Sequence, residues 1–382
     1  MIPVPSRLRA LLPSARGIRL VCTWFLLSRL AIYAVGVVGA ATFLHQRTLT
    51  TAHHDAINPA VTWHQWDALW YEYIARHGYT PGPNSPSAAA AAFFPLYPAI
   101  VGALLTIVPG VSFFWMATIV SNVCSLLALL LMARIAESRG GIDAVTRLLV
   151  VVLTAAGSFY LSIPYAEGLL LLLVVVTTLL SDCGRYRASA LAAGLGAVTK
   201  PQGAALLFVP VVGFFRRSRG FSRLTRAAQL AVVVGIAAVP IVIYLIVLTR
   251  AAGSPLAFAG GQAFWDNTTP YPLKAVVGLV QFPNWLSGWL HGAVWAVYVG
   301  LLVRYWRRLS LEQALFCAGV LLVSTMQESF HGAYRYVVIL APLFFAIAED
   351  EDARVRTAVV AFNLVLAVIM ILAFVTHNRL VV

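Results

Sequence analysis

The chain has 382 residues, of which 60% are hydrophobic and only 11% are charged. Charged residues make up about 25% of a typical soluble protein, so this composition excludes an ordinary soluble domain. Long apolar runs alternate with short polar loops, which predicts a single all-α polytopic membrane domain over residues 1–382. The net charge of +13 comes mostly from arginines in short loops beside apolar runs. This is the positive-inside pattern, and it argues against nucleic-acid binding.

The first apolar segment, at about 18–44, is longer than the roughly 7–15-residue core of a signal peptide and predicts a retained transmembrane helix. Arginines at positions 7, 9 and 16 precede it, so we expect the N-terminus in the cytoplasm and the following loop, about 45–92, outside. Arg29 falls inside this span, where a charge costs about 2.5–3.5 kcal/mol on insertion scales. We therefore expect Arg29 to face the protein interior in an ion pair, with a ligand contact as the alternative.

A polar and aromatic stretch, Trp63–Tyr79, lies in this first external loop. Thr62 and Gln65 have the spacing of a capping box, and bulky aromatic and aliphatic residues then recur every three or four positions. The pattern predicts an amphipathic helix that starts near Trp63 and lies flat on the bilayer surface.

Asp67 is the residue of this stretch that we expect to carry the chemistry. On the predicted helix, the side chains of His64, Trp70 and Tyr71 are its nearest neighbours, and Trp66 directly precedes it. A carboxylate among aromatic rings at the membrane surface suits a general base that acts on a lipid-linked substrate. The alternative is a membrane anchor whose aromatic residues lie at the level of the lipid headgroups while Asp67 only faces water.

The region Phe93–Ala136 allows two topologies. It begins with FFPLYP, whose prolines suit the first turn of a helix, and it is long enough for two crossings divided at Pro109-Gly110. Two crossings would leave the arginines at 134, 139 and 147 outside, whereas one crossing plus a partly inserted segment would place them inside, as the charge rule prefers. The sequence leaves both options open. Further spans are expected at about 147–163 and 165–181, with Glu167 near the outer face.

The apolar segment 188–215 is interrupted by TKPQG, Thr199–Gly203, because a residue that precedes proline disfavours helix. Each arm is shorter than the roughly 20 residues that a crossing needs, and basic sequences flank both ends. We therefore expect a short hairpin whose tip carries Lys200 to the same side as Asp67. The other expected spans are at about 227–249, 286–303, 311–327 and 333–348, with a last one ending near Val375 and a second external loop at about 250–286.

The predicted topology leaves few candidates for chemistry on the outer side. Among the acidic residues there, Asp67 and Glu167 lie where an aromatic or apolar wall favours a base. Cationic residues on the same side favour transfer from an anionic leaving group such as a phosphate, although helix-end cations can also simply snorkel towards water. The expected substrate contacts are Glu167, Lys200, Gln202, His331, Arg335 and Tyr336, together with His64, Trp66, Trp70 and Tyr71.

We do not expect the chemistry to require a metal or another cofactor. The sequence has no D-x-D motif and no convincing cluster of ligands, although Asp67 with Glu167 could hold a divalent cation weakly. The cysteines are widely separated and predict neither a zinc site nor a disulfide framework: Cys22, Cys124, Cys183 and Cys317.

The motif W-D-x-x-W-Y-x-x-I-A-x-x-G-Y at Trp66–Tyr79 is followed in order by FFPLYP, SIPYAEG, TKPQG and a late YRY. Together these motifs, over about 66–345, resemble the bacterial relatives of the PIG-V type GPI mannosyltransferase II. The resemblance implies a GT-C glycosyltransferase fold with about 10–12 transmembrane segments and a polyprenyl-phosphate mannose donor. It also implies that an aspartate in the first external loop is the base, and that role falls on Asp67. In TKPQG the relatives more often carry arginine, so we do not expect bidentate phosphate recognition by Lys200.

We therefore expect an enzyme of the bacterial plasma membrane that transfers a mannosyl or other hexosyl unit from a polyprenyl-phosphate carrier to a lipid, glycan or protein acceptor outside the cytoplasm. Asp67 would deprotonate the acceptor, and Lys200 and Arg335 would hold the carrier phosphate. A single displacement would invert the anomeric centre. The alternative is a secondary transporter or flippase of a lipid-linked or anionic substrate, which Arg29 and the broken TKPQG segment favour.

Overall fold

The computed structural model describes residues 12–43, 58–79, 87–264, 271–281, 286–327, 330 and 332–376. Every regular element in these ranges is an α-helix or a short 3-10 helix, as expected for an all-α membrane protein. Within this part of the chain, five helices are long and apolar enough to cross a membrane: α1 (Ala15–Phe43), α6 (Phe113–Leu153), α10 (Arg223–Ala252), α13 (Leu286–Tyr305) and α17 (Ala353–Val375).

Shorter helices fill the space between the long ones. Several of the spans expected from the sequence are made of these shorter pieces rather than of one continuous helix. In chain order they are α2 (Pro59–Thr62), α3 (Asp67–His77), α4 (Ser87–Ala90), α5 (Leu96–Ile107), η2 (Ser158–Leu161), α7 (Glu167–Asp182), α8 (Tyr186–Ala197), η3 (Pro201–Leu207), α9 (Phe208–Arg217), α11 (Ala257–Phe264), α12 (Lys274–Gln281), α14 (Leu311–Val323), α15 (Ala333–Tyr336), η4 (Val337–Ile339) and α16 (Ala341–Ala348).

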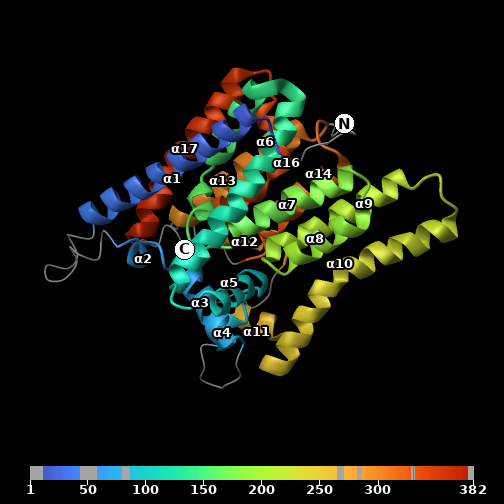
Figure 1. Cartoon of the computed structure of the whole chain (residues 1–382), viewed down its shortest axis with the longest axis horizontal. Coiled ribbons are helices and arrows are strands. Elements are labelled where there is room, and N and C mark those ends of the chain that lie inside the picture. Colours follow the sequence, from blue (N-terminus) through green and yellow to red (C-terminus); the bar gives the residue numbers. More distant parts are fainter. Residues whose placement is uncertain are drawn as a thin grey trace.

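The long helices differ in how much protein covers them. Helices α1, α6 and α17 lie together along one flank of the molecule, whereas α10 lies at the outer edge on another side and packs against α8 (Figure 1). Apolar side chains such as Val234, Ile243 and Ile246 are exposed on α10, as on a helix that faces lipid. Its ends follow from local sequence, because the Ser222 hydroxyl accepts a hydrogen bond from the Thr225 amide and Gly253 adopts a left-handed conformation.

The region 93–136 contains one short helix and the first arm of one long helix. The 12-residue α5 is too short to cross a membrane, and α6 begins after it at Phe113. Helix α6 turns back at Gly140 and Gly141, which have non-helical dihedral angles. Near this turn Arg139 forms an ion pair with Glu349 at 3.0 Å, and Glu137 accepts a hydrogen bond from Ser14. The arrangement agrees with one crossing plus a short segment, and Arg139 and Arg147 both contact residues 348–349.

Two of the predicted spans are wrong as continuous α-helices. The span expected at 147–163 stops at Leu153, and residues 154–166 contain only the 3-10 helix η2. The span expected at 333–348 is divided into α15, η4 and α16. Pro342 cannot donate a backbone hydrogen bond to the preceding turn, so it starts the new helix α16 instead of continuing the old one.

The hairpin predicted around TKPQG is confirmed. Helix α8 ends at Ala197, Lys200 is extended with φ −158° and ψ 157°, and η3 starts at Pro201. The two arms touch so closely that a Cβ atom added at Gly203 would lie 1.9 Å from the carbonyl oxygen of Gly196. Only glycine fits there, and this close approach fixes where Lys200 emerges.

Candidate functional site

Helix α3 begins at Asp67, and the predicted start near Trp63 is wrong. Trp66 has φ 56° and ψ −121°, a strained conformation for a residue other than glycine, and it interrupts the chain between α2 and α3. The predicted capping box does not form, because the Gln65 side-chain amide donates to the Thr62 carbonyl at 2.5 Å. Asp67 is thereby placed in the first turn of α3, where the helix dipole favours a carboxylate.

The aromatic face of α3 contacts protein. Tyr71 is buried and forms edge contacts with Tyr97 at 5.2 Å and with Tyr165 at 6.2 Å between ring centroids. Trp70 stacks on Phe93 at 5.8 Å. Of the residues whose spacing predicted a lipid-facing stripe, Ile74 is buried and Trp70 is half-buried, whereas Leu69 is 53% exposed. Protein therefore covers part of this stripe.

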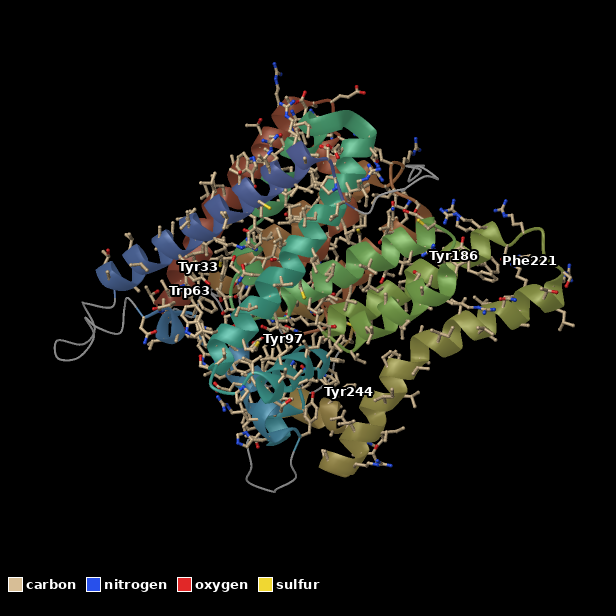
Figure 2. The ribbon with its side chains drawn as sticks, viewed as in Figure 1. Tyr33, Trp63, Tyr97, Tyr186, Phe221 and Tyr244 are labelled. Atoms are coloured by element: carbon tan, nitrogen blue, oxygen red, sulfur yellow. The ribbon has the colours of Figure 1, made fainter. Side chains whose placement is uncertain are left out.

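Trp63, the first residue of the polar and aromatic stretch 63–79, is also buried. Its ring lies 5.6 Å from that of Tyr33 in α1, and Figure 2 shows the two side chains next to each other. A Cβ atom added at Gly36 of α1 would lie 2.1 Å from the Trp63 ring. The loop that precedes Asp67 is therefore held against the first long helix.

Four charged residues from distant parts of the sequence form one continuous network. Arg335 contacts Asp67 with Nη1–Oδ2 at 2.9 Å and Glu167 with Nε–Oε1 at 3.0 Å. Lys200 Nζ lies 2.5 Å from the same Glu167 oxygen. The side chains are 21% exposed for Asp67, 12% for Arg335, 7% for Lys200 and 1% for Glu167. Asp67 is thus the member nearest to solvent, and Glu167 is the buried centre.

Tyrosine rings surround the cations of this network. The Arg335 guanidinium lies 5.3 Å from the ring centroid of Tyr160, 5.6 Å from that of Tyr165 and 5.2 Å from that of Tyr336. Lys200 Nζ lies 5.5 Å from the Tyr336 ring. The faces of aromatic rings attract cations, and the rings also exclude water, which strengthens the nearby charge interactions.

Burial and the neighbouring charges act together on the ionisable groups of this site. Burial raises the pKa of Tyr71 well above its usual value, and the negative charges of Asp67 and Glu167 raise it further. Burial lowers the pKa of Arg335, but Asp67, Tyr336 and Glu167 outweigh that effect and hold it well above its usual value. Arg335 therefore stays cationic and Tyr71 stays neutral at physiological pH.

Local sequence explains how each element presents its side chain. Glu167 is the first residue of α7, where the helix dipole favours a negative charge. Lys200 is extended because it precedes Pro201. Arg335 lies in the single turn α15, whose start is set by Gly332 with φ 73°.

His64 does not have the position that a helix starting near Trp63 predicted. It lies before α3, and its Nε2 is 3.1 Å from the Glu72 carboxylate, which also pairs with Arg76 at 2.7 Å. Burial against neighbouring protein lowers the pKa of His64, although Glu72 opposes this effect. His64 belongs to a second, more exposed charge group beside Asp67 rather than to the Arg335 network.

The remaining predicted contacts divide into two groups. Tyr336 lies against both cations of the network, whereas Gln202 is 1% exposed and its side-chain oxygen has no hydrogen-bond partner among the described residues. His331 lies outside the described residues. Sequence reasoning missed Tyr160 and Tyr165, although Tyr160 lies just before SIPYAEG and Tyr165 lies inside it, two residues before Glu167.

No group of three or more histidine, cysteine, aspartate or glutamate side chains suited to a metal occurs within the described ranges. Comparisons of the chain with family models, with curated proteins and with solved structures found no match. A function for this chain has therefore to be proposed from its own residues and their geometry.

Proposed function

We propose that the protein is a mannosyltransferase of the GT-C type in a bacterial plasma membrane, with about 10–12 membrane segments and a polyprenyl-phosphate mannose donor. The observation that carries the proposal is the contact of Arg335 with both Asp67 and Glu167, beside Lys200 and within tyrosine walls. This arrangement combines a carboxylate accessible to solvent with two partly buried cations. A base and an anion-binding pair are the two parts that transfer from a sugar phosphate needs.

The reaction that we propose is a single displacement. Asp67 accepts the proton of the acceptor hydroxyl, and the hydroxyl oxygen forms a bond to the anomeric carbon of mannose. The bond from that carbon to the phosphate oxygen breaks, and polyprenyl phosphate leaves with the electron pair. The leaving group needs no proton if cations bind its charge.

Arg335 and Lys200 are suited to bind that phosphate. The contacts of Arg335 with the two carboxylates use Nη1 and Nε, so its Nη2 group can donate to a phosphate oxygen. Lys200 adds a second positive charge, but as a point charge rather than a planar fork. The low exposure of both side chains strengthens their attraction for an anion.

The state of Glu167 favours inversion at the anomeric carbon. Glu167 is 1% exposed and shares one oxygen between two cations, which makes it a poor nucleophile. Retention would need a second accessible carboxylate beside the sugar. We therefore assign Glu167 the task of holding Lys200 and Arg335 in place.

Transfer of labelled mannose tests this proposal. The purified protein in liposomes should convert polyprenyl-phosphate mannose to polyprenyl phosphate in the presence of a membrane extract that supplies the lipid, glycan or protein acceptor. The Asp67→Asn variant in the same liposomes is the matched control. An intact donor under all these conditions would argue against a transferase.

A secondary transporter or flippase remains the second candidate, because Lys200 lies at a break between helices and pairs with a buried carboxylate. A transporter would move labelled anionic or lipid-linked substrate across the liposome membrane and leave its glycosidic bond intact. Separate measurement of transport and of bond cleavage therefore distinguishes the two functions.

A further inference from the structure

Arg29 is a buried cation at the midpoint of α1 and is 7% exposed. Its expected carboxylate partner is absent: the described residues place neutral groups around it. Nε donates to the Asn122 side chain at 2.9 Å, and Nη2 donates to the Ser125 hydroxyl at 2.9 Å and to the Leu161 carbonyl at 3.1 Å. A charge in the middle of a membrane helix is costly, so the presence of an arginine at this position calls for a structural or functional explanation.

The Leu161 carbonyl belongs to the non-α-helical residues 154–166, which we call the linking segment because it joins α6 to α7. Backbone carbonyls outside regular helices must find donors inside a membrane protein. A row of polar side chains on α6 supplies them: Ser121 donates to the Tyr165 carbonyl at 2.7 Å, and Asn122 donates to the Ser162 carbonyl at 2.8 Å. Arg29 completes this row and ties it to α1.

The linking segment also touches the backbone around Arg335. A Cβ atom added at Gly157 would lie 2.8 Å from the Arg335 Cα atom. The hydroxyl groups of Tyr160 and Tyr334 are 2.8 Å apart, and the Tyr160 ring faces the Arg335 guanidinium. The linking segment thus contacts Arg29 through the Leu161 carbonyl and the residues around Arg335 through Gly157 and Tyr160.

We propose that Arg29 is a positioning residue for the site around Arg335. Together with the Ser125 hydroxyl, which also donates to the Leu161 carbonyl at 3.1 Å, Arg29 fixes the linking segment, which carries two of the tyrosines around Arg335 and ends one residue before Glu167. The effect of Arg29 on activity can be measured only if the protein transfers mannose, so that part rests on the proposed function. The effect of Arg29 on the order of the linking segment can be measured without it. The side chain of Arg29 touches no member of the ion-pair network, so it acts only through the linking segment.

The test replaces Arg29 by methionine in the full chain. Arg29→Met removes a buried charge and its donors while it keeps an unbranched apolar side chain, so insertion and the thermal midpoint should be kept. The backbone amides of residues 158–166 should exchange hydrogen faster. The kcat/KM for polyprenyl-phosphate mannose should fall by about 10- to 100-fold, because small misplacements of reacting groups have effects of that size.

Two further variants make the result specific. Arg19→Met changes an exposed arginine of the same helix and should alter none of the three measurements. Arg29→Lys keeps the charge but has one donor nitrogen in place of three, so it should restore part of the protection and part of kcat/KM. It also keeps the proposal testable if the methionine variant fails to insert.

The outcomes separate this proposal from the proposed function. Unchanged exchange at residues 158–166 in Arg29→Met, or a general loss of stability with faster exchange throughout, would overturn the positioning role. Faster exchange confined to 158–166, in a protein whose wild type transfers no mannose, would support the structural role of Arg29 and overturn the mannosyltransferase instead.

Discussion

Ion pairs occur at both ends of α7, but the two ends are built differently. Glu167 at its start belongs to the network of Asp67, Arg335 and Lys200, in which both cations are at most 12% exposed. At the other end, about 24 Å away for a 16-residue helix, Asp182 pairs with Arg217, which is 36% exposed. Figure 1 shows α7 running between these two regions of the molecule.

The second region contains further pairs of the same exposed type. Asp350 contacts Arg304 at 3.1 Å and Arg308 at 3.6 Å, and these arginines are 47% and 46% exposed. Exposed pairs contribute little to stability, whereas removal of one partner from a buried network leaves a charge that nothing compensates. Residue type alone does not distinguish the two regions. The second region also holds a well-covered cation, Arg139, which pairs with Glu349 and is 15% exposed. The Arg335 region differs because Lys200 and Arg335, each at most 12% exposed, share one oxygen of a buried carboxylate, and this is the region that we propose to bind an anion.

Among substitutions in the two regions, loss of the base Asp67 should slow mannosyl transfer most. Asp67→Asn keeps the shape of the side chain but cannot accept a proton, so mannosyl transfer should slow by at least about a hundredfold. Donor binding should change little. Single-turnover transfer and equilibrium binding of labelled donor measure the two effects separately.

Glu72→Gln is the control for this variant, because Glu72 lies on the same helix but pairs with His64 and Arg76. Its effect on transfer should be much smaller. Near wild-type transfer by Asp67→Asn, together with loss of transfer in Glu167→Gln, would show that the base is assigned to the wrong carboxylate.

The next largest effect should come from Arg335→Ala. The substitution removes the guanidinium that joins Asp67 to Glu167, and donor affinity should fall by about thirtyfold or more, from a loss of roughly 2 kcal/mol or more. Arg304→Ala, the matched change at the exposed pair, should leave donor affinity unchanged. Equal effects of the two substitutions would contradict the distinction drawn between the regions.

A smaller effect is expected at Lys200. Lys200→Ala should weaken donor binding by about tenfold, because Arg335 still binds Glu167 and the phosphate. Lys200→Arg should be milder, since it keeps the charge, whereas Arg335→Lys should be severe because a planar fork is lost. Donor binding that is unaffected in Lys200→Ala would indicate that this side chain only neutralises Glu167.

The smallest effect on transfer should come from Asp182, at the exposed end of α7. Burial raises the pKa of Asp182 to about 6, although Arg217 opposes this effect. A raised pKa means that the folded state favours the protonated form, so this stabilisation is present below about pH 4 and is lost as the pH rises through about 6. In Asp182→Asn, the thermal midpoint should therefore fall less between pH 4 and 7 than in the wild type. Mannosyl transfer should be unchanged.

The sequence predicted four of the long helices well, because each contains a continuous apolar run: α1, α10, α13 and α17. It left the region of α6 open, because charged residues and two glycines interrupt that helix. Helix α17 ends at Val375 and α13 starts at Leu286, as expected. It also predicted the hairpin at Lys200, since proline and the flanking arginines act locally. The breaks in the spans expected at 147–163 and 333–348 were missed, because apolar composition does not reveal whether a buried segment is helical or is held by side chains from elsewhere.

The sequence by itself determined which charged residues could meet. The distribution of arginines sets which loops share a side, and this alone grouped Asp67, Glu167, Lys200 and Arg335. Only the tertiary structure decided how they meet, with Glu167 at the centre, tyrosines from the linking segment around Arg335, and Arg29 bound to neutral groups. The physical reason is that hydropathy and charge patterns are properties of neighbouring residues in the chain, whereas these contacts depend on how segments pack that lie from 33 residues apart, for Glu167 and Lys200, to 268 apart, for Asp67 and Arg335.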